Sequence, residues 1–348
     1  MKEKMENTRE NKLQPLLADC TLCPRNCHVN RLAGEIGYCG QGAVIRAARA
    51  ALHFWEEPCI SGESGSGTVF FSGCPLRCVY CQNHDIAIGK AGREISVERL
   101  SEIFLELQEK GANNINLVTP THFVPLIVPA LLRAKAQGLK IPVVYNTSSY
   151  EKAETLRLLE GLVDIYLPDF KYVSAETAGW FSHAPDYFET AKAAIAEMLR
   201  QVGSPVFAAP DGRLLNARQM NEACGYEGET EAEFLMKRGV IVRHLALPGQ
   251  EEDSRRALRF LLDTWGEDIY ISIMNQYTPM GDFGGSVAAP GAGERKRAAF
   301  KNLGRRITEE EYDALIDFAV ENGIENGFLQ EGETAEESFI PAFDGEGL

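Results

Sequence analysis

Strand-like and helix-like runs alternate along the sequence from Gly67 onward, and this alternation constrains the fold more than any other feature. Strand-like runs cover residues 68–73, 113–119, 142–147, 164–170, 239–246 and 269–275. Helical segments are expected near residues 97–110, 124–137, 151–160, 176–202 and 253–266. Strands that alternate with helices are typical of βα units, so the sequence predicts an α/β fold built around a parallel sheet.

Two local patterns support individual helices. In the first helical segment the apolar residues recur at i, i+3, i+4 and i+7, namely at Leu100, Ile103, Phe104 and Leu107. This spacing predicts an amphipathic helix with one face against the sheet. Near the C-terminus, Thr308 is followed by three glutamates. That start is typical of a capping box and predicts a last helix over residues 307–322.

Clustered cysteines give the strongest indication of chemistry. Cys74, Cys78 and Cys81 have the spacing C-x3-C-x2-C and follow the strand-like run 68–72 directly. Three thiolates can hold three corners of a [4Fe–4S] cluster, which normally takes four, so one iron would stay open to another ligand. A loop at the carboxyl end of a strand is where barrel enzymes place their chemistry. The alternative is a zinc site completed by Cys59, His84 or Cys224.

A second group of cysteines precedes the first strand. Its spacing is x2, x3 and x11, over Cys20, Cys23, Cys27 and Cys39. Four thiols are enough to close a tetrahedral site, and prolines and glycines around them supply the turns. Structural zinc and a second iron–sulfur cluster both fit this group, and uncoordinated reduced thiols are the third alternative. His28 lies inside the group and is expected at the surface.

The central motif resembles the signature of the radical S-adenosylmethionine (radical SAM) enzymes, because Tyr80 places an aromatic residue before the last cysteine. Longer stretches are similar to iron–sulfur proteins related to pyruvate formate-lyase activating enzyme, and the resemblance covers about residues 20–345. These stretches are 65–83, 114–123, 164–172, 239–249 and 272–279, together with the first cysteine group. The resemblance implies a partial (β/α)6 barrel of the TIM type.

The same resemblance implies the cofactors. A [4Fe–4S] cluster would bind the amino and carboxylate groups of S-adenosylmethionine through its open iron. One electron, from a donor of the flavodoxin or ferredoxin type, would then split S-adenosylmethionine into methionine and a 5′-deoxyadenosyl radical. No residue beyond the cluster ligands is assigned a catalytic role.

The predicted organisation has four parts. Residues 1–18 form a polar tail, and residues 19–66 form a Cys-rich metal-binding segment with one helix over Val44–Phe54. Residues 67–280 form the barrel, with an acidic insertion at about 216–235. Residues 281–348 hold a loop rich in glycine and alanine, expected over 281–297, and the C-terminal helix.

Polar residues at the predicted strand ends are the candidate S-adenosylmethionine contacts. Many radical SAM enzymes carry Gly-Gly-Glu after the second strand, whereas this chain has Thr119, Thr121 and His122 in that region. A backbone contact is therefore expected there without the acidic side chain. His122 is either a donor to the ligand or a capping histidine of the next helix.

The later strand ends resemble activating enzymes more closely. Asn146 and Thr147 lie where those enzymes have Thr-Asn-Gly near the nucleoside, and Asp169 and Lys171 match their Asp-x-Lys. Arg243 on the fifth strand can hold a carboxylate with two hydrogen bonds, and its alternative role is a salt bridge to Asp169. Asn275 ends the sixth strand and is either a ligand contact or part of a turn.

Three functions compete at this stage. The first is hydrogen abstraction from a protein or peptide, for example to form a glycyl radical in a partner enzyme. The second is the same chemistry on a small molecule or another macromolecule. The third is a non-catalytic metal-binding or electron-transfer protein, which would not need charged residues at strand ends.

Charge and hydropathy exclude some partners. Lys plus Arg total 35 and Asp plus Glu total 50, a formal net charge of −15, which disfavours nucleic acid as a partner. The longest apolar run, Phe123–Leu132, has ten residues including two prolines, well short of the ~20 that a membrane span needs. The charged N-terminus lacks a secretory pattern, so a cytoplasmic location is expected.

Overall fold

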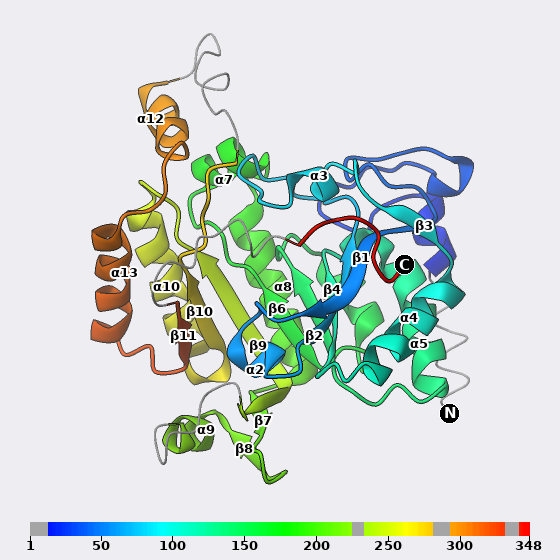
Figure 1. Ribbon diagram of the computed structural model, residues 1–348. Helices are drawn as coiled ribbons and strands as arrows, with labels where there is room; N and C mark the ends of the chain where they lie inside the picture. Colours follow the sequence, from blue (N-terminus) through cyan, green and yellow to red (C-terminus); the bar gives the residue numbers. More distant parts are fainter. Residues whose placement is uncertain (1–12, 225–232, 281–292, 331–340) are drawn as a thin grey trace.

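A parallel sheet forms the centre of the molecule, as the computed structural model shows for residues 13–224, 233–280, 293–330 and 341–348 (Figure 1). Six consecutive strands in the sheet are parallel to one another. They are β2 (Ser66–Phe71), β4 (Ile115–Val118), β5 (Val143–Thr147), β6 (Ile165–Pro168), β9 (Leu235–Leu245) and β10 (Tyr270–Met274). These strands confirm the six predicted ones, and most of their residues are buried, as expected for strands covered on both faces.

Further strands extend the sheet at both edges. β11 (Gly327–Leu329) is parallel to β10, while β1 (Ile45–His53) is antiparallel to β2 and β3 (Arg93–Ile95) is antiparallel to β1. A small hairpin of β7 (Val206–Ala208) and β8 (Leu214–Asn216) pairs with β9. Among the described residues the order runs from β11 to β3 with no pairing between these two ends, so the sheet is open.

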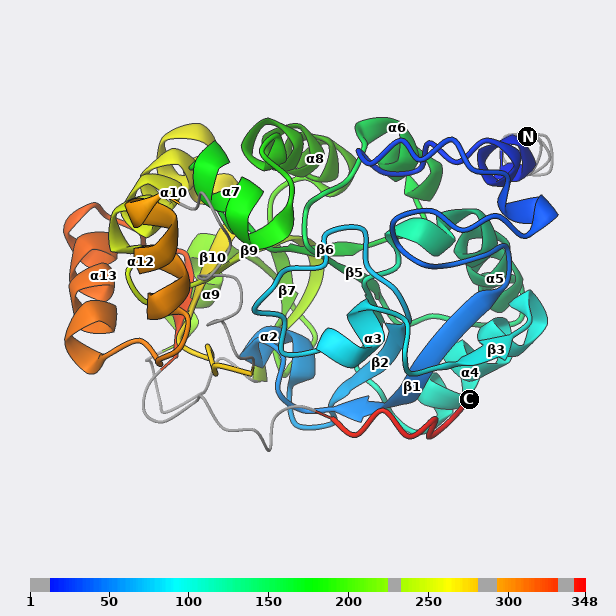
Figure 2. The ribbon, with the colours of Figure 1, turned by 90° about the horizontal axis from the view of Figure 1, so that it is seen from above.

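Helices cover one side of the sheet (Figure 2). The longer ones are α4 (Val97–Glu109), α5 (Val124–Ala136), α7 (Ala175–Ser182), α8 (Tyr187–Val202) and α10 (Glu251–Trp265). The predicted helix over 151–160 is split into α6 (Ala153–Leu156) and the 3-10 turn η3 (Arg157–Leu159). Short elements complete this part of the chain, namely η1 (Arg31–Ala33), α2 (Pro58–Ser61), α3 (His84–Ala87), η2 (Thr121–Phe123) and η5 (Gly266–Asp268).

Local sequence explains where these helices begin and end. The Ser96 side chain accepts a hydrogen bond from the backbone N–H of Arg99 and caps α4, whose four apolar residues at helical spacing are all buried. The predicted helix over 176–202 is wrong in its middle. His183 adopts a left-handed conformation with φ 50° and ends α7, so α8 starts again at Tyr187.

The predicted helix over Val44–Phe54 is also wrong, because this segment forms strand β1. Its four alanines favour a helix by propensity alone. In the fold they lie beside β2, and the pairing runs from Ala47 opposite Phe71 to His53 opposite Ser66. Tertiary pairing therefore overrides the local preference.

The chain termini pack on the domain more than predicted. Residues 13–18 are helical, and Leu13 and Leu17 are buried, so this part of the predicted polar tail contributes to the core. Residues 1–12 lie outside the described residues. At the other end, residues 345–346 run beside β1, with the Gly345 N–H donating to Ala48 O at 3.0 Å.

The remaining expectations fall partly on residues that are not described. Of the predicted insertion at 216–235, α9 (Ala217–Ala223) is described and residues 225–232 are not. Of the predicted loop over 281–297, residues 281–292 are not described, and the rest begins α12 (Glu294–Asn302). The described C-terminal residues, 293–330 and 341–348, thus include α12 and a second helix, α13 (Glu309–Glu321), and Thr308 forms the predicted capping box of α13. No described helix combines the length and the apolar character that a bilayer crossing requires.

Candidate functional site

The central cysteines lie in the segment between β2 and α3, and residues 74–81 are called the cysteine loop below. The Cys74 Sγ accepts hydrogen bonds from the N–H of Leu76 at 3.4 Å and of Arg77 at 3.5 Å. Arg77 has φ 51°, a left-handed conformation that turns the chain between the first two cysteines. The loop therefore folds back on the first cysteine through its own backbone.

The electrostatics of the cysteine loop fit a metal cluster. Burial, and then the neighbouring Cys78 thiol, raises the pKa of Cys74 to about 11 and that of Cys81 to about 12. Because these two pKa values lie well above neutral pH, Cys74 and Cys81 keep their protons unless metal cations replace them. The donor set and its position after the first parallel strand thus fit three ligands of a [4Fe–4S] cluster.

A chain of hydroxyl groups leads to the middle cysteine. Ser182 Oγ donates to Cys78 Sγ at 3.1 Å, and it lies 2.8 Å from the Tyr172 hydroxyl. The Tyr172 and Tyr80 hydroxyls are 2.6 Å apart. Sequence analysis identified only Tyr80, because Tyr172 and Ser182 are distant in sequence and carry no motif. Hydrogen bonds to a ligand sulfur change the reduction potential of a cluster, so these three hydroxyl groups belong to the candidate site.

Three charged residues, called the charged triad below, meet at the ends of β6 and β9. Lys171 Nζ lies 2.7 Å from Asp169 Oδ2, and an Arg243 guanidinium nitrogen lies 3.0 Å from Asp169 Oδ1. Burial alone would raise the pKa of Asp169, but the charges of Lys171 and then Arg243 outweigh it and hold the pKa below its usual value. The predicted salt bridge between Asp169 and Arg243 is therefore present.

Glu56 joins this group and was missed by the sequence analysis. It follows β1, and its Oε2 lies 3.2 Å from Arg243 Nη1. Its other oxygen accepts from the side-chain amides of Asn116 at 3.0 Å and Asn146 at 3.3 Å. Burial raises the pKa of Glu56 while Arg243 opposes the rise. Because all three neighbours are donors, the contacts suit the ionised carboxylate.

Thr119 and His122, the predicted ligand contacts after β4, form hydrogen bonds with other residues of the protein. The Thr119 N–H donates to Asn146 O at 2.9 Å, with φ 56° at Thr119. His122 is buried, and its Nε2 lies 2.7 Å from Ser72 O, just before the cysteine loop. Burial lowers the pKa of His122 to about 3, so the ring is neutral and Nε2 is the donor. His122 thus anchors the end of β2.

The buried side chain of Glu151 accepts hydrogen bonds from Thr121 and Thr147, two of the predicted contact residues. The Glu151 Oε1 accepts from Thr121 Oγ1 at 2.5 Å, Thr147 Oγ1 at 2.6 Å and the Tyr145 hydroxyl at 3.3 Å. Both threonine hydroxyls are thus bonded to Glu151. Asn146 instead faces the charged triad, where its Oδ1 accepts from Arg243 Nη2 at 2.6 Å. The backbone N–H of Asn275, directly after β10, donates to Gln330 Oε1 at 2.8 Å.

The first cysteine group lies in a compact turn, and residues 20–42 are called the N-terminal cysteine segment below. The Cys20 N–H donates to Val29 O at 3.0 Å, and Cys27 Sγ accepts from the Tyr38 N–H at 3.3 Å. Burial, together with the nearby Cys39 and Cys20 thiols, raises the pKa of Cys23 to about 12. His28 is exposed and pairs with Asp19 at 2.8 Å, as expected for a surface residue.

Neither cysteine group is arranged around a single ion. In the described part of the chain, no three His, Cys, Asp or Glu side chains form a group that could hold a metal ion. A four-iron cluster differs from one ion because each of its cysteines binds a different iron. The residues that could complete a zinc site at the cysteine loop have other surroundings. Cys59 and Cys224 pack in a separate hydrophobic cluster, and His84 pairs with Asp85.

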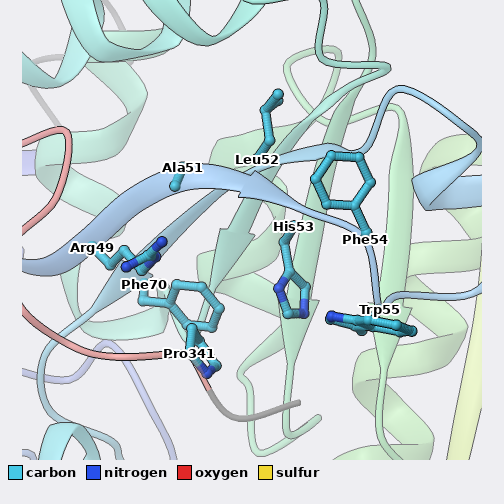
Figure 3. A pocket seen from close by; sticks show the side chains of 8 residues that line it. All are labelled: Arg49, Ala51, Leu52, His53, Phe54, Trp55, Phe70 and Pro341. Atoms are coloured by element: carbon cyan, nitrogen blue, oxygen red, sulfur yellow. The ribbon is translucent and has the colours of Figure 1, made fainter. Parts of the chain in front are cut away.

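A pocket opens on β1 and on the two residues that follow this strand (Figure 3). Its lining is mainly apolar and aromatic, and consists of Arg49, Ala51, Leu52, His53, Phe54, Trp55, Phe70 and Pro341. Burial, and then the charge of Arg49, lowers the pKa of His53 to about 4, so this ring is neutral. The pocket can accept an apolar or aromatic group, and Glu56 follows its Trp55 in sequence. None of its residues was identified from the sequence.

Comparison with known proteins identifies a domain. Residues 68–212 match the family model described as Radical SAM superfamily. This range contains the cysteine loop together with Asp169 and Lys171, whereas Arg243 lies beyond it. An uncharacterized protein of Methanocaldococcus jannaschii, MJ0674, is 24% identical over 314 residues, which cover 87% of this chain and 75% of the relative.

Solved structures of SuiB from Streptococcus suis also match this chain, with a lower sequence identity than MJ0674 has. SuiB bound to its precursor peptide SuiA gives a TM-score of 0.43 at 10% identity, with coverage of 75% of this chain and 47% of SuiB. SuiB bound to S-adenosylmethionine gives a TM-score of 0.42 at 10% identity, with coverage of 77% and 48%. The chain thus spans about half the length of SuiB.

Proposed function

We propose that this chain, which carries a radical SAM superfamily domain over residues 68–212, cleaves S-adenosylmethionine to generate a radical. Cys74, Cys78 and Cys81 would hold a [4Fe–4S] cluster with one iron open. When bound, the cluster supplies the electron that splits S-adenosylmethionine into methionine and a 5′-deoxyadenosyl radical. The observation that carries the proposal is the C-x3-C-x2-C cysteine loop at the carboxyl end of the first parallel strand, inside the range that matches the Radical SAM superfamily model.

The charged triad is the proposed site for the methionyl group of S-adenosylmethionine. Its amino and carboxylate groups need partners of opposite charge, and Asp169 with Lys171 and Arg243 offers both signs at one strand edge. Without ligand these residues pair with one another, which keeps buried charges compensated. Ligand binding would exchange some of these internal contacts for contacts to S-adenosylmethionine.

Aromatic rings shield the same region from water. Tyr80 packs edge-on against Tyr172, Phe181 and Tyr277, with ring centroids 6.0 to 6.4 Å apart. Tyr80 and Tyr172 are buried, and burial raises the pKa of both, so their hydroxyls stay neutral. Excluding water limits side reactions of a reactive intermediate.

The N-terminal cysteine segment is proposed to hold a second metal centre. Four cysteines are a ligand set for zinc and for an iron–sulfur cluster. Because the four side chains are not arranged around a single ion in this structure, zinc binding would require them to move together, and the metal content distinguishes the two. The proposed reductant is a one-electron donor of the flavodoxin or ferredoxin type, and nucleic acid is not an expected partner. The proposed substrate is a protein or peptide, with a glycyl radical enzyme as the specific candidate. The sequence similarity to activating enzymes supports this choice.

Anaerobic reconstitution with iron and sulfide tests the proposal. The wild type is expected to bind four irons at the cysteine loop, to show an EPR signal that shifts with S-adenosylmethionine, and to release 5′-deoxyadenosine after reduction. Cys78→Ala should lose all three properties. Cys224→Ser, which changes a cysteine outside both groups, should keep them. A wild type that binds no cluster and cleaves no S-adenosylmethionine would overturn the proposal.

Metal content and substrate need separate measurements. Zinc near one per chain would assign zinc to the N-terminal cysteine segment, and about eight irons would assign a second cluster. Incubation of the reduced enzyme with a glycyl radical enzyme from the same source should give a glycyl radical EPR doublet. Cleavage of S-adenosylmethionine without this doublet would overturn the glycyl radical assignment and leave the radical SAM proposal intact.

A further inference from the structure

Arg25 connects the N-terminal cysteine segment to the cysteine loop. It lies between Cys23 and Cys27 in sequence, and its guanidinium donates hydrogen bonds to four backbone carbonyls. Two of these belong to the cysteine loop, Pro75 O at 2.8 Å and Leu76 O at 3.4 Å. The others lie at the C-terminal end of α7, at Ser182 O and His183 O. One side chain thus joins three separate segments of the chain.

The two carbonyls in the cysteine loop belong to peptide units that serve Cys74. The Pro75 carbonyl shares its peptide plane with the Leu76 N–H, and the Leu76 carbonyl shares its plane with the Arg77 N–H. Both of these N–H groups donate to Cys74 Sγ, at 3.4 and 3.5 Å. Arg25 therefore fixes one end of each peptide unit while the opposite end points at the sulfur.

Stacking restricts the Arg25 side chain further. Its guanidinium lies 4.1 Å from the centroid of the Tyr38 ring and 5.0 Å from that of Tyr150. The Arg77 guanidinium lies 5.3 Å from the same Tyr38 ring. Tyr38 precedes Cys39, so the last cysteine of the N-terminal group helps to place the ring that holds both arginines.

The two segments also approach each other through their backbones. A Cβ at Gly73, which directly precedes the cysteine loop and has φ 85°, would lie 2.6 Å from the backbone oxygen of Cys39. Only glycine allows such a close approach. A shift of the N-terminal cysteine segment must therefore move the cysteine loop as well.

We propose that Arg25 is a positioning residue that sets the N–H···S hydrogen bonds to Cys74, and that metal bound by the N-terminal cysteines holds Arg25 in place. The inference rests on the proposed [4Fe–4S] cluster at the cysteine loop. Two proposed metal ligands flank Arg25 in sequence, so a filled N-terminal site fixes the turn that carries it. Hydrogen bonds to ligand sulfurs raise the reduction potential, because they stabilise the more negative, reduced cluster.

The test compares reduction potentials by EPR-monitored titration. Arg25→Lys keeps the charge but loses the planar fork, so the potential should fall, by up to about 59 mV for a tenfold change in the one-electron equilibrium. Cys27→Ser should lower it similarly, and the double variant should not add the two shifts. Arg46→Lys is the matched control, since Arg46 also donates to two carbonyls, of Gly89 and Gly92, outside the cysteine loop.

Amide hydrogen exchange of residues 74–78 gives a readout without a cluster. Wild type, Arg25→Lys and Arg46→Lys are measured with the N-terminal metal in place and the cysteine loop free of iron, and Cys27→Ser is measured under the same conditions without its full ligand set. Exchange should be faster in Arg25→Lys and Cys27→Ser than in wild type and Arg46→Lys. Wild-type exchange and potential in Arg25→Lys would overturn the role of Arg25. Wild-type behaviour of Cys27→Ser alone would overturn the link to the N-terminal metal. Failure of the proposed function would appear instead as a wild type without a reducible cluster.

Discussion

Glu56 and Arg243 form an ion pair of 3.2 Å across 187 positions of sequence. Glu56 comes from the segment after the antiparallel strand β1, and Arg243 comes from β9 within the parallel sheet. Asn116 on β4 and Asn146 on β5 bind the second Glu56 oxygen. The carboxylate therefore ties the end of β1 to three parallel strands, next to the charged triad.

Glu56→Gln should destabilise the fold. The new amide group must point its N–H₂ either at the Arg243 guanidinium or at the two asparagine amides, all of which are donors. Breaking a buried pair in this way costs about 3 kcal/mol of the free energy of unfolding. Chemical denaturation measures the loss. Glu63→Gln, at an exposed position before β2, is the control and should change stability by less than about 0.5 kcal/mol. Equal stabilities would contradict the structural role of Glu56.

Asp169→Asn should weaken S-adenosylmethionine binding at least tenfold, about 1.4 kcal/mol. The substitution leaves Lys171 and Arg243 without their shared carboxylate, so the two cations repel each other where the methionyl group is proposed to bind. Titration of the S-adenosylmethionine-dependent EPR shift gives the affinity. Asp164→Asn at the opposite end of β6 should bind as wild type does. Unchanged affinity in Asp169→Asn would remove the charged triad from the binding site.

Ser182→Ala should lower the reduction potential of the cluster. The serine hydroxyl donates to Cys78 Sγ at 3.1 Å, and a hydrogen bond of about 1 kcal/mol corresponds to roughly 40 mV for one electron. Tyr80→Phe should produce a smaller shift, because Tyr80 acts through Tyr172 and Ser182. Ser204→Ala, near the exposed end of α8, serves as the control. A Ser182→Ala potential equal to that of wild type would show that the hydroxyl does not tune the cluster.

The sequence predicts the parallel strands well because each is a short apolar run, followed by polar residues at its carboxyl end. Because the carboxyl ends of parallel strands meet at one edge of the sheet, the pattern predicts that Asp169 and Arg243 lie close together, and they form an ion pair. The same reasoning fails at β1. Its alanines favour a helix by local propensity, and pairing with β2, which no local pattern shows, makes the segment a strand.

The site residues that sequence reasoning missed share one property. Glu56, Ser182 and Arg25 act on groups more than 45 positions away, and their local sequences are typical of exposed turns or helix ends. Glu56 precedes another glutamate and a proline, a pattern that indicates a solvated turn. Their roles depend on tertiary contacts, which no short pattern in a single sequence encodes.

Glu151 provides a pH-dependent prediction. Burial raises the pKa of Glu151 to about 7 from 4.5, and its hydroxyl donors offset only part of that rise. The folded protein therefore binds this proton more tightly than the unfolded chain does. The stability contributed by the proton is complete below pH 4.5 and is lost as pH rises to about 7. At roughly 1.4 kcal/mol per pH unit, the loss is about 3 kcal/mol.

Glu151→Gln should remove this loss, because glutamine mimics the protonated acid and its oxygen can still accept from Thr121 and Thr147. Burial also lowers the pKa of His122 to about 3 and that of His244 to about 4, so both favour folding as pH rises towards 6.5. They titrate in wild type and variant alike and cancel in the difference. Urea unfolding between pH 5 and 8 should therefore show the variant gaining stability over wild type with rising pH, which exposed Glu154→Gln should not do. Parallel curves for wild type and Glu151→Gln would mean that the carboxyl ionises normally in the fold.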